Sequence, residues 1–244
     1  MGARWTGHEH SESKLEDSQL DALAKKNVNT PGRRAAFVAI MSSSDAQDAA
    51  WRCNELVRLS TADEGDIATA CLHCCGAEKA YNRFYADFLA VFVVGKKKAN
   101  FALKLALWDS VNKLQASKTP EQWRVAANVG KLLGSCIASG AASFIAFKPI
   151  GIESVLSPDS VGTAVLLASA LRSLMEVGDV EFETAAYRAR ADTAETRDAR
   201  DALAAFVSRR LTPANNVADL PRFKRRKAKL HAALLGEDMA AADE

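Results

Sequence analysis

Residues 71–85 read Cys-Leu-His-Cys-Cys-Gly-Ala-Glu-Lys-Ala-Tyr-Asn-Arg-Phe-Tyr, and this stretch decides the fold that the chain predicts. Its three cysteines are three and four positions apart, a spacing that places side chains on one face of a helix. Gly76 is typical of a residue that ends a helix, and apolar residues resume at Tyr81. The stretch therefore predicts a helix that ends near Gly76 and a polar corner that leads into another helix.

Apolar residues recur at spacings of three and four along most of the chain, which is the periodicity of amphipathic helices. Pro120 behind Thr119 fits the first turn of a further helix that runs to Ile137, and residues 161–177 predict another. No alternation with a period of two extends beyond a few residues. The other predicted stripes are Ala49, Cys53, Leu56 and Val57; Ile67, Ala70, Cys71, Cys74 and Cys75; Phe84, Phe88, Leu89 and Phe92; and Phe101, Leu105, Trp108, Val111 and Leu114.

These helices are of ordinary length and are joined by short loops, so neighbouring helices must run back along each other. The sequence therefore predicts an all-α fold of stacked antiparallel helical hairpins. It divides into a flexible polar arm (1–30), a helical domain (31–178), a surface linker with a closing helix packed on the domain (179–211), and a basic and then acidic tail (212–244).

Composition narrows the class of protein. The 244 residues carry a formal net charge of +2, and 48% are hydrophobic, which is ordinary for a globular protein and too weakly basic to predict nucleic-acid binding by itself. The five cysteines lack the dense spacing of a secreted disulfide scaffold and favour a reducing compartment, cytosol or nucleus. The longest uncharged run, residues 132–147, is shorter than the roughly 20 residues that cross a bilayer. We expect neither a secretory signal nor membrane insertion.

The sequence contains no motif typical of a zinc site, a catalytic thiol or a phosphate-binding loop. Adjacent cysteines on one helix beside His73 lack the separated ligand pairs of structural zinc sites, and packing explains them better. His73 faces away from the cysteine stripe, which leaves a catalytic thiol without a base. Gly95-Lys96 and Gly130-Lys131 lack the other residues of a phosphate-binding loop. We expect no enzymatic activity, no metal, no cofactor and no small-molecule substrate.

The stretch at residues 71–85 resembles the signature of the MA-three domain in nucleolar proteins that pair this domain with a middle domain of translation initiation factor 4G. Further segments agree in order along the chain, so that the resemblance spans about residues 33 to 211. It implies a HEAT-like stack of the MA-three type. The agreeing segments are residues 33–42 and 48–56, which look like the entry helices; 101–109 and 124–133, which are similar to the central pair; and 199–211, which resembles the closing helix.

The resemblance implies a scaffold in nucleolar assembly of the small ribosomal subunit and pre-rRNA processing, with pre-ribosomal proteins and rRNA as partners. It also implies contact with a DEAD-box RNA helicase related to initiation factor 4A. However, Lys113 and Gln115 stand where related nucleolar sequences look acidic, and this chain does not include the middle domain. Two alternatives stay open: a spliceosomal MA-three protein that engages a DEAD-box helicase, and a translational regulator that binds initiation factor 4A.

Candidate binding residues fall into two groups. Trp108-Asp109 has the composition of an interface anchor, although the register of Trp108 favours the core, with Asp109 exposed. Asn82 is expected to shape the turn, while Lys79 and Arg83 are candidates for the surface. The partner-binding candidates are Lys79, Asn82, Arg83, Trp108 and Asp109. The RNA-binding candidates are Lys96, Lys97 and Lys98 in a predicted loop, and Arg222, Lys224, Arg225, Arg226, Lys227 and Lys229 in the predicted tail, where nuclear import or simple disorder are the alternatives.

Overall fold

The computed structural model describes residues 29–190, 197–214, 219–237 and 239. All regular secondary structure in these residues is helical, which confirms the predicted all-α class. The elements are α2 (Pro31–Met41), α3 (Ala46–Arg58), α4 (Glu64–Ala77), α5 (Phe84–Val93), α6 (Lys97–Gln115), α7 (Pro120–Ser139), the 3-10 helix η1 (Phe144–Phe147), α8 (Ile152–Leu156), α9 (Val161–Glu176), α10 (Asp179–Arg190), α11 (Arg197–Arg209) and α12 (Leu220–Leu235).

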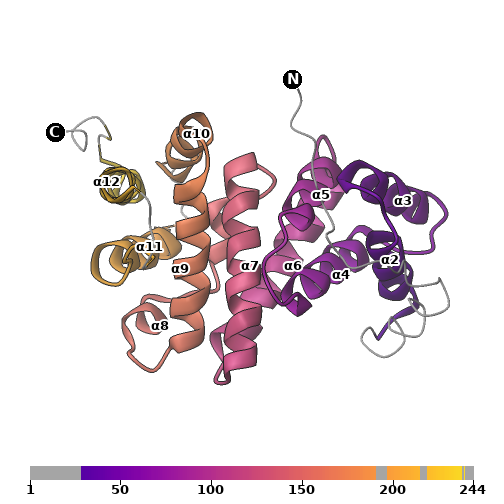
Figure 1. The fold of residues 1–244 in the computed structure, drawn as a ribbon, viewed down its shortest axis with the longest axis horizontal. Helices are drawn as coiled ribbons and strands as arrows, with labels where there is room; N and C mark the ends of the chain where they lie inside the picture. The colour runs from indigo at the N-terminus through magenta and orange to yellow at the C-terminus, as the bar shows by residue number, and fades with distance from the viewer. Residues whose placement is uncertain (1–28, 191–196, 215–218, 238, 240–244) are drawn as a thin grey trace.

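The helices stack as hairpins along the long axis of the molecule (Figure 1). Helices α2, α4 and α6 contact one another in succession, and α3, α5 and α7 do the same in a second layer. Helix α9 then lies along α7 in the most extensive helix pair of the fold, and α8, α10, α11 and α12 cover the far end. This arrangement is the HEAT-like stack that the sequence predicted.

Local sequence signals set several helix starts. Side chains of Thr30, Asp45 and Asp63 accept hydrogen bonds from backbone N–H groups in the first turns of α2, α3 and α4. Thr119 and Gln122 form a reciprocal capping box at the start of α7, with Pro120 in the first turn. The predicted start of this helix is therefore confirmed.

Two glycines allow α7 and α9 to approach closely. A Cβ atom on Gly130 would lie 2.5 Å from the carbonyl oxygen of Leu166, and one on Gly134 would overlap the carbonyl oxygen of Ala170. Gly130 and Gly134 are four positions apart, so both lie on the same side of α7. Their role is packing between helices.

The C-terminal segments differ from the prediction. The predicted linker begins with a regular helix, α10, because Phe182, Ala185 and Ala186 bury one side of it. The predicted basic tail contains helix α12, which buries Phe223 and Leu230 against the fold. Both differences have the same cause, because α10 and α12 each carry an apolar stripe with helical spacing between many charged residues. Residues 1–28 of the predicted arm (1–30), residues 191–196 of the predicted linker and the last residues of the predicted tail (240–244) lie outside the described residues.

Among the residues that the structure describes, no helix is both long enough and apolar enough to cross a membrane.

Candidate functional site

The cysteine stripe lies in the core. All five cysteines are buried and unpaired, and His73 is exposed. Burial raises the pKa of the Cys53, Cys74 and Cys136 thiols to about 12, and it raises the pKa of Cys71 and Cys75 well above the usual range. These thiols are protonated at neutral pH and pack as small apolar side chains. The described residues contain no cluster of His, Cys, Asp or Glu suited to a metal ion.

The corner after α4 is stabilised from α7. Helix α4 ends at Ala77, close to the predicted position, but Gly76 does not adopt the left-handed conformation of a helix-ending glycine. Instead, its missing side chain makes room for Val125, whose Cγ1 would lie 2.9 Å from an added Cβ. Arg124 donates hydrogen bonds to the carbonyl oxygens of Gly76, Ala77 and Glu78. The helix end is therefore satisfied by a neighbouring helix rather than by its own sequence.

The predicted partner-binding residues of this corner have different environments. Lys79 is exposed, and Arg83 is exposed with its Nε atom 3.3 Å from Asp87 Oδ1. The side-chain oxygen of Asn82 accepts a hydrogen bond from the backbone N–H of Phe84 at 3.0 Å. Asn82 thus shapes the turn, as predicted, while Lys79 and Arg83 stay predictions of a binding surface.

Helix α6 presents an apolar stripe to solvent. The predicted core stripe was wrong for Phe101, which is 57% exposed, and for Leu105, which is 41% exposed, whereas Val111 and Leu114 are buried as predicted. Leu103 and Leu107, which were not in the predicted stripe, are also buried on the side of α6 that faces the core. Both stripes have helical spacing, so periodicity alone does not determine which of the two lies in the core.

Trp108 continues the exposed stripe and is anchored at one edge. It is half-buried, and its indole Nε1 donates a hydrogen bond to the carbonyl oxygen of Ile145 at 2.8 Å. Asp109, the next residue, is exposed, as expected for that position. Trp108 is therefore neither a fully buried core residue nor a free interface anchor.

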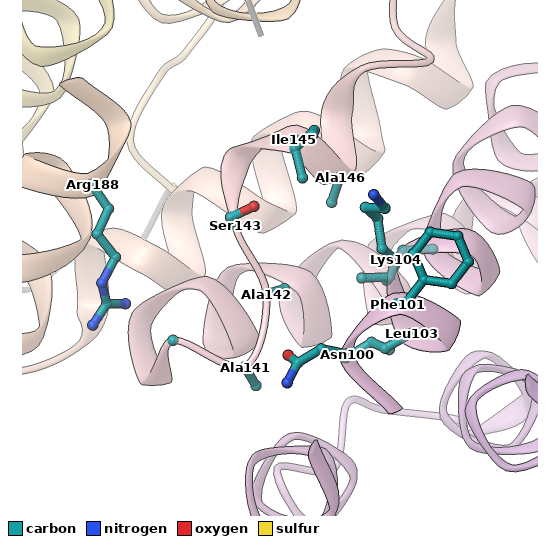
Figure 2. Close-up of a pocket in the computed structure, with 12 residues that line it drawn as sticks. Asn100, Phe101, Leu103, Lys104, Ala141, Ala142, Ser143, Ile145, Ala146 and Arg188 are labelled. Carbon is teal, nitrogen blue, oxygen red and sulfur yellow. The ribbon is translucent and has the colours of Figure 1, made fainter. Parts of the chain in front are cut away.

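A hollow of about 320 Å³ lies beside this stripe, between α6 and the segment that follows α7. Figure 2 shows Phe101 and Lys104 on the α6 side, Ala142 and Ile145 on the facing segment, and Arg188 of α10 across the opening. We call this hollow, together with the half-buried Trp108 and the exposed Leu105 and Lys148 next to it, the α6 groove. The remaining lining residues are Asn100, Leu103, Leu107, Gly140, Ala141, Ser143 and Ala146.

Two lysines lie over the aromatic rings of the α6 groove. The Lys104 ammonium is 4.9 Å from the ring centroid of Phe101 and 5.1 Å from that of Trp108. The Lys148 ammonium is 5.5 Å from the Trp108 ring. Such cation–π contacts hold positive charge directly over an apolar surface.

The triple lysine is not a loop cluster. Lys97 and Lys98 begin α6 and are exposed, whereas Lys96 is half-buried. The Lys96 ammonium lies 2.7 Å from the side-chain oxygen of Asn54 and 4.9 Å from the Phe92 ring, and burial lowers its pKa. Lys96 is therefore tied to the fold, and only Lys97 and Lys98 are available to a polyanion.

Most cations of the predicted basic tail bind within the fold. Arg226 is buried; it donates to the carbonyl oxygens of Met175 and Val177, each at 2.7 Å, and pairs with Asp179. Arg222 also contacts Val177 and Asp179, Lys227 donates to the carbonyl oxygen of Leu211 at 2.8 Å, and Lys229 lies 2.9 Å from Glu183. Lys224 and Arg225 are exposed. Arg226 is therefore unavailable to RNA, contrary to the prediction, and Arg222, Lys227 and Lys229 are held by contacts within the fold.

Sequence reasoning missed a set of arginines that cap the C-terminal ends of other helices. Each donates to backbone carbonyl oxygens at a helix end, where positive charge is favoured. One sequence pattern could have revealed them: an arginine that lies between apolar residues on the same side of a helix, as Arg226 does, is expected to be buried. The pairs are Arg124 with the end of α4, Arg188 with Ile137 of α7, Arg210 with Val155 of α8, Arg226 with Met175 of α9, and Arg200 with Leu234 of α12.

Parts of this chain are similar to known proteins. The MA3 domain family matches residues 32–143. The nucleolar MIF4G domain-containing protein 1 homolog of Drosophila melanogaster is 31% identical over 105 residues, which cover 43% of this chain and 12% of that protein. Suppressor of glycerol defect protein 1 of Schizosaccharomyces pombe is 28% identical over 140 residues, which cover 56% of this chain and 18% of that protein. The human nucleolar MIF4G domain-containing protein 1 is 29% identical over 129 residues, which cover 47% of this chain and 15% of that protein.

The chain thus spans less than a fifth of the length of these relatives. The match begins and ends within the described stack, from α2 to the segment after α7. Residues 32–143 therefore match the MA3 domain family, and this part of the chain is similar to the nucleolar MIF4G domain-containing proteins, which agrees with the resemblance first noted in residues 71–85.

Proposed function

We propose that this chain is a non-enzymatic scaffold in nucleolar assembly of the small ribosomal subunit. The observation that carries the proposal is an MA3 domain whose relatives are named nucleolar proteins. Its fold supports the same function, because a stack of hairpins offers long outer surfaces for protein binding. The buried, protonated cysteines support a structural rather than a catalytic use of the central helices.

Protein contact is the main activity in this proposal. Large apolar side chains lie exposed at separate places on the stack, including Trp51 on α3 and Phe101 on α6. Exposed aromatic residues are enriched where proteins bind one another. The pre-ribosomal partners would occupy such surfaces, and Lys79, Arg83 and Asp109 would lie at their polar margins.

Contact with rRNA is a secondary part of the proposal. It rests on four exposed lysines and arginines, Lys97, Lys98, Lys224 and Arg225. Exposed cations can neutralise phosphates without reading sequence, and such binding weakens as salt rises. With so few cations, we expect weak, salt-sensitive association that assists protein contacts.

The test is purification of the tagged chain from nucleolar extract, with and without ribonuclease. The proposal expects nucleolar localisation and recovery of pre-rRNA with small-subunit assembly proteins, part of which survives ribonuclease treatment. Recovery of spliceosomal small nuclear RNAs in place of pre-rRNA would contradict it and favour the splicing alternative. Cytoplasmic localisation with initiation factor 4A as the main protein recovered would favour the translational regulator.

A further inference from the structure

The α6 groove combines positive charge and exposed apolar surface without acidic side chains. Among the described residues that line its hollow, Lys104 and Arg188 are the charged ones and none is Asp or Glu. Lys148 adds a third positive charge at its edge, over Trp108. Cations gathered around an open apolar surface produce a positive potential, which attracts a negatively charged partner.

The groove exposes apolar side chains on both of its sides. Phe101 and Leu105 stand one helical turn apart with 57% and 41% of their surfaces exposed. Ile145 and Ala142 provide a half-buried apolar wall on the other side. The volume of about 320 Å³ is at the lower end of the roughly 300–1,000 Å³ of ligand pockets. This size suits side chains that project from a peptide.

The ring contacts favour a peptide over single-stranded RNA. RNA bases bind such sites by stacking on open aromatic faces. Here Lys104 lies over both aromatic rings and Lys148 lies over Trp108. The Trp108 indole N–H is also occupied by the carbonyl oxygen of Ile145. Carboxylates, by contrast, can pair with these ammonium groups while an apolar side chain contacts the exposed part of Phe101.

We propose that the α6 groove binds an acidic, apolar peptide segment of a partner protein. One or two aliphatic or aromatic side chains of the segment contact Phe101, Leu105 and Ile145, and its carboxylates pair with Lys104, Lys148 and Arg188. This inference rests on the proposed use of the MA3 domain as a protein-binding module. It names the surface and the chemistry of the segment that it binds.

The test is fluorescence anisotropy with the full chain and a fluorescein-labelled peptide built from Glu, Asp, Leu and Phe. Matched probes are the same peptide with Gln and Asn in place of Glu and Asp, and labelled oligouridine. We expect the acidic peptide to bind, and Lys104→Glu to weaken its binding about tenfold by turning attraction into repulsion. Phe101→Ala is expected to weaken it by about fivefold, because an exposed apolar contact is lost.

Lys113→Glu is the matched control. Lys113 is exposed on the same helix, nine positions beyond Lys104 and so about half a turn away around the axis. It should leave affinity within about twofold, since it makes the same change of charge outside the groove. Circular dichroism of each variant should show the helix content and Tm of the parent chain.

Three results would overturn the inference. The neutral peptide could bind as tightly as the acidic one, Lys104→Glu and Lys113→Glu could have equal effects, or oligouridine could bind in preference to the peptide and be lost in Phe101→Ala. A chain that localises elsewhere but binds the acidic peptide at Lys104 would defeat the nucleolar proposal alone. A nucleolar chain that ignores the peptide would defeat this inference alone.

Discussion

Asn128 of α7 donates its side-chain N–H to the carbonyl oxygen of Glu78 at 2.8 Å, just past the end of α4. The same amide lies 3.3 Å from the carbonyl oxygen of Cys75, within the last turn of that helix. Asn128 itself is 4% exposed. A buried side chain of one helix thus replaces the hydrogen bonds that the end of another helix lacks.

Replacement of Asn128 by Ala should destabilise the fold by about 1–3 kcal/mol, because the carbonyl oxygens of Cys75 and Glu78 lose this donor. Urea unfolding followed by circular dichroism measures the change. Asn112, which is exposed on α6, gives the control, and Asn112→Ala should change stability by less than about 0.5 kcal/mol. Equal unfolding midpoints for the two variants would show that the link between α4 and α7 contributes nothing.

Replacement of Gly134 by Ala should cost about 1–3 kcal/mol, since the new methyl group would overlap the backbone of α9 at Ala170. The measurement is the free energy of unfolding in urea. Gly151→Ala is the control, because no atom lies within 4 Å of a Cβ added there. It should cost less than about 1 kcal/mol. A harmless Gly134→Ala would mean that α7 and α9 can move apart at little cost.

Replacement of Arg226 by Met should destabilise the C-terminal end of the stack by about 2–4 kcal/mol. The change leaves the carbonyl oxygens of Met175 and Val177 without this donor. Hydrogen exchange should then speed up in α12 and at the end of α9, while exchange in α4 stays slow. Arg225→Met removes an exposed neighbour and should leave both rates unchanged. Identical exchange in the two variants would argue against a structural role for Arg226.

Asp179 should make stability depend on pH at the acidic end. The hydrogen bond from Arg226 lowers the pKa of Asp179 below its usual value, so the folded state binds this proton less readily than the unfolded state does. The stabilisation is therefore complete above the unfolded pKa, about 3.9, and is lost as pH falls through the lowered folded value. Asp179→Asn removes it at every pH.

The measurement is urea unfolding of the parent chain and Asp179→Asn at several pH values from neutral to acidic. The difference in free energy of unfolding should be largest near neutrality and should shrink as the pH falls below about 3.9. Glu181→Gln changes an exposed carboxylate of the same helix and serves as the control. A difference that stays constant across the acidic range would contradict the proposed ion pair.

The five cysteines should react with a thiol reagent only after unfolding. Burial raises their pKa values, so little thiolate exists at pH 8 and little of it is accessible. The measurement is the number of reactive thiols with and without denaturant. Fast labelling of Cys71 or Cys75 in the folded chain would contradict their packing role and reopen a chemical one.

The features that the sequence predicted well depend on neighbouring residues. Thr119, Pro120 and Gln122 lie within four consecutive positions and form the capping box and first turn by themselves, so the sequence was enough to predict the start of α7. The exposed stripe of Phe101 and Leu105 was misassigned because α6 has two apolar faces, and only the packing of other helices distinguishes them.

The charged end of the chain was misread for a related reason. Arg226 looks like one of many surface cations until the end of α9 is placed beside it, about fifty positions earlier in the sequence. The hollow of the α6 groove likewise exists only because the segment after α7 and Arg188 of α10 meet α6 in space. Such contacts join residues that are far apart in the sequence, so no pattern of neighbouring residues predicts them.

The packing of α9 on the glycine-lined side of α7 determines where a recombinant fragment of the protein should end. A recombinant piece trimmed to the family match would stop at residue 143 and discard α9, the element on which Gly130 and Gly134 rest. Such a piece would expose a bare apolar flank and invite aggregation. A piece that continues through Gly236 keeps that flank covered and retains the C-terminal helices with it.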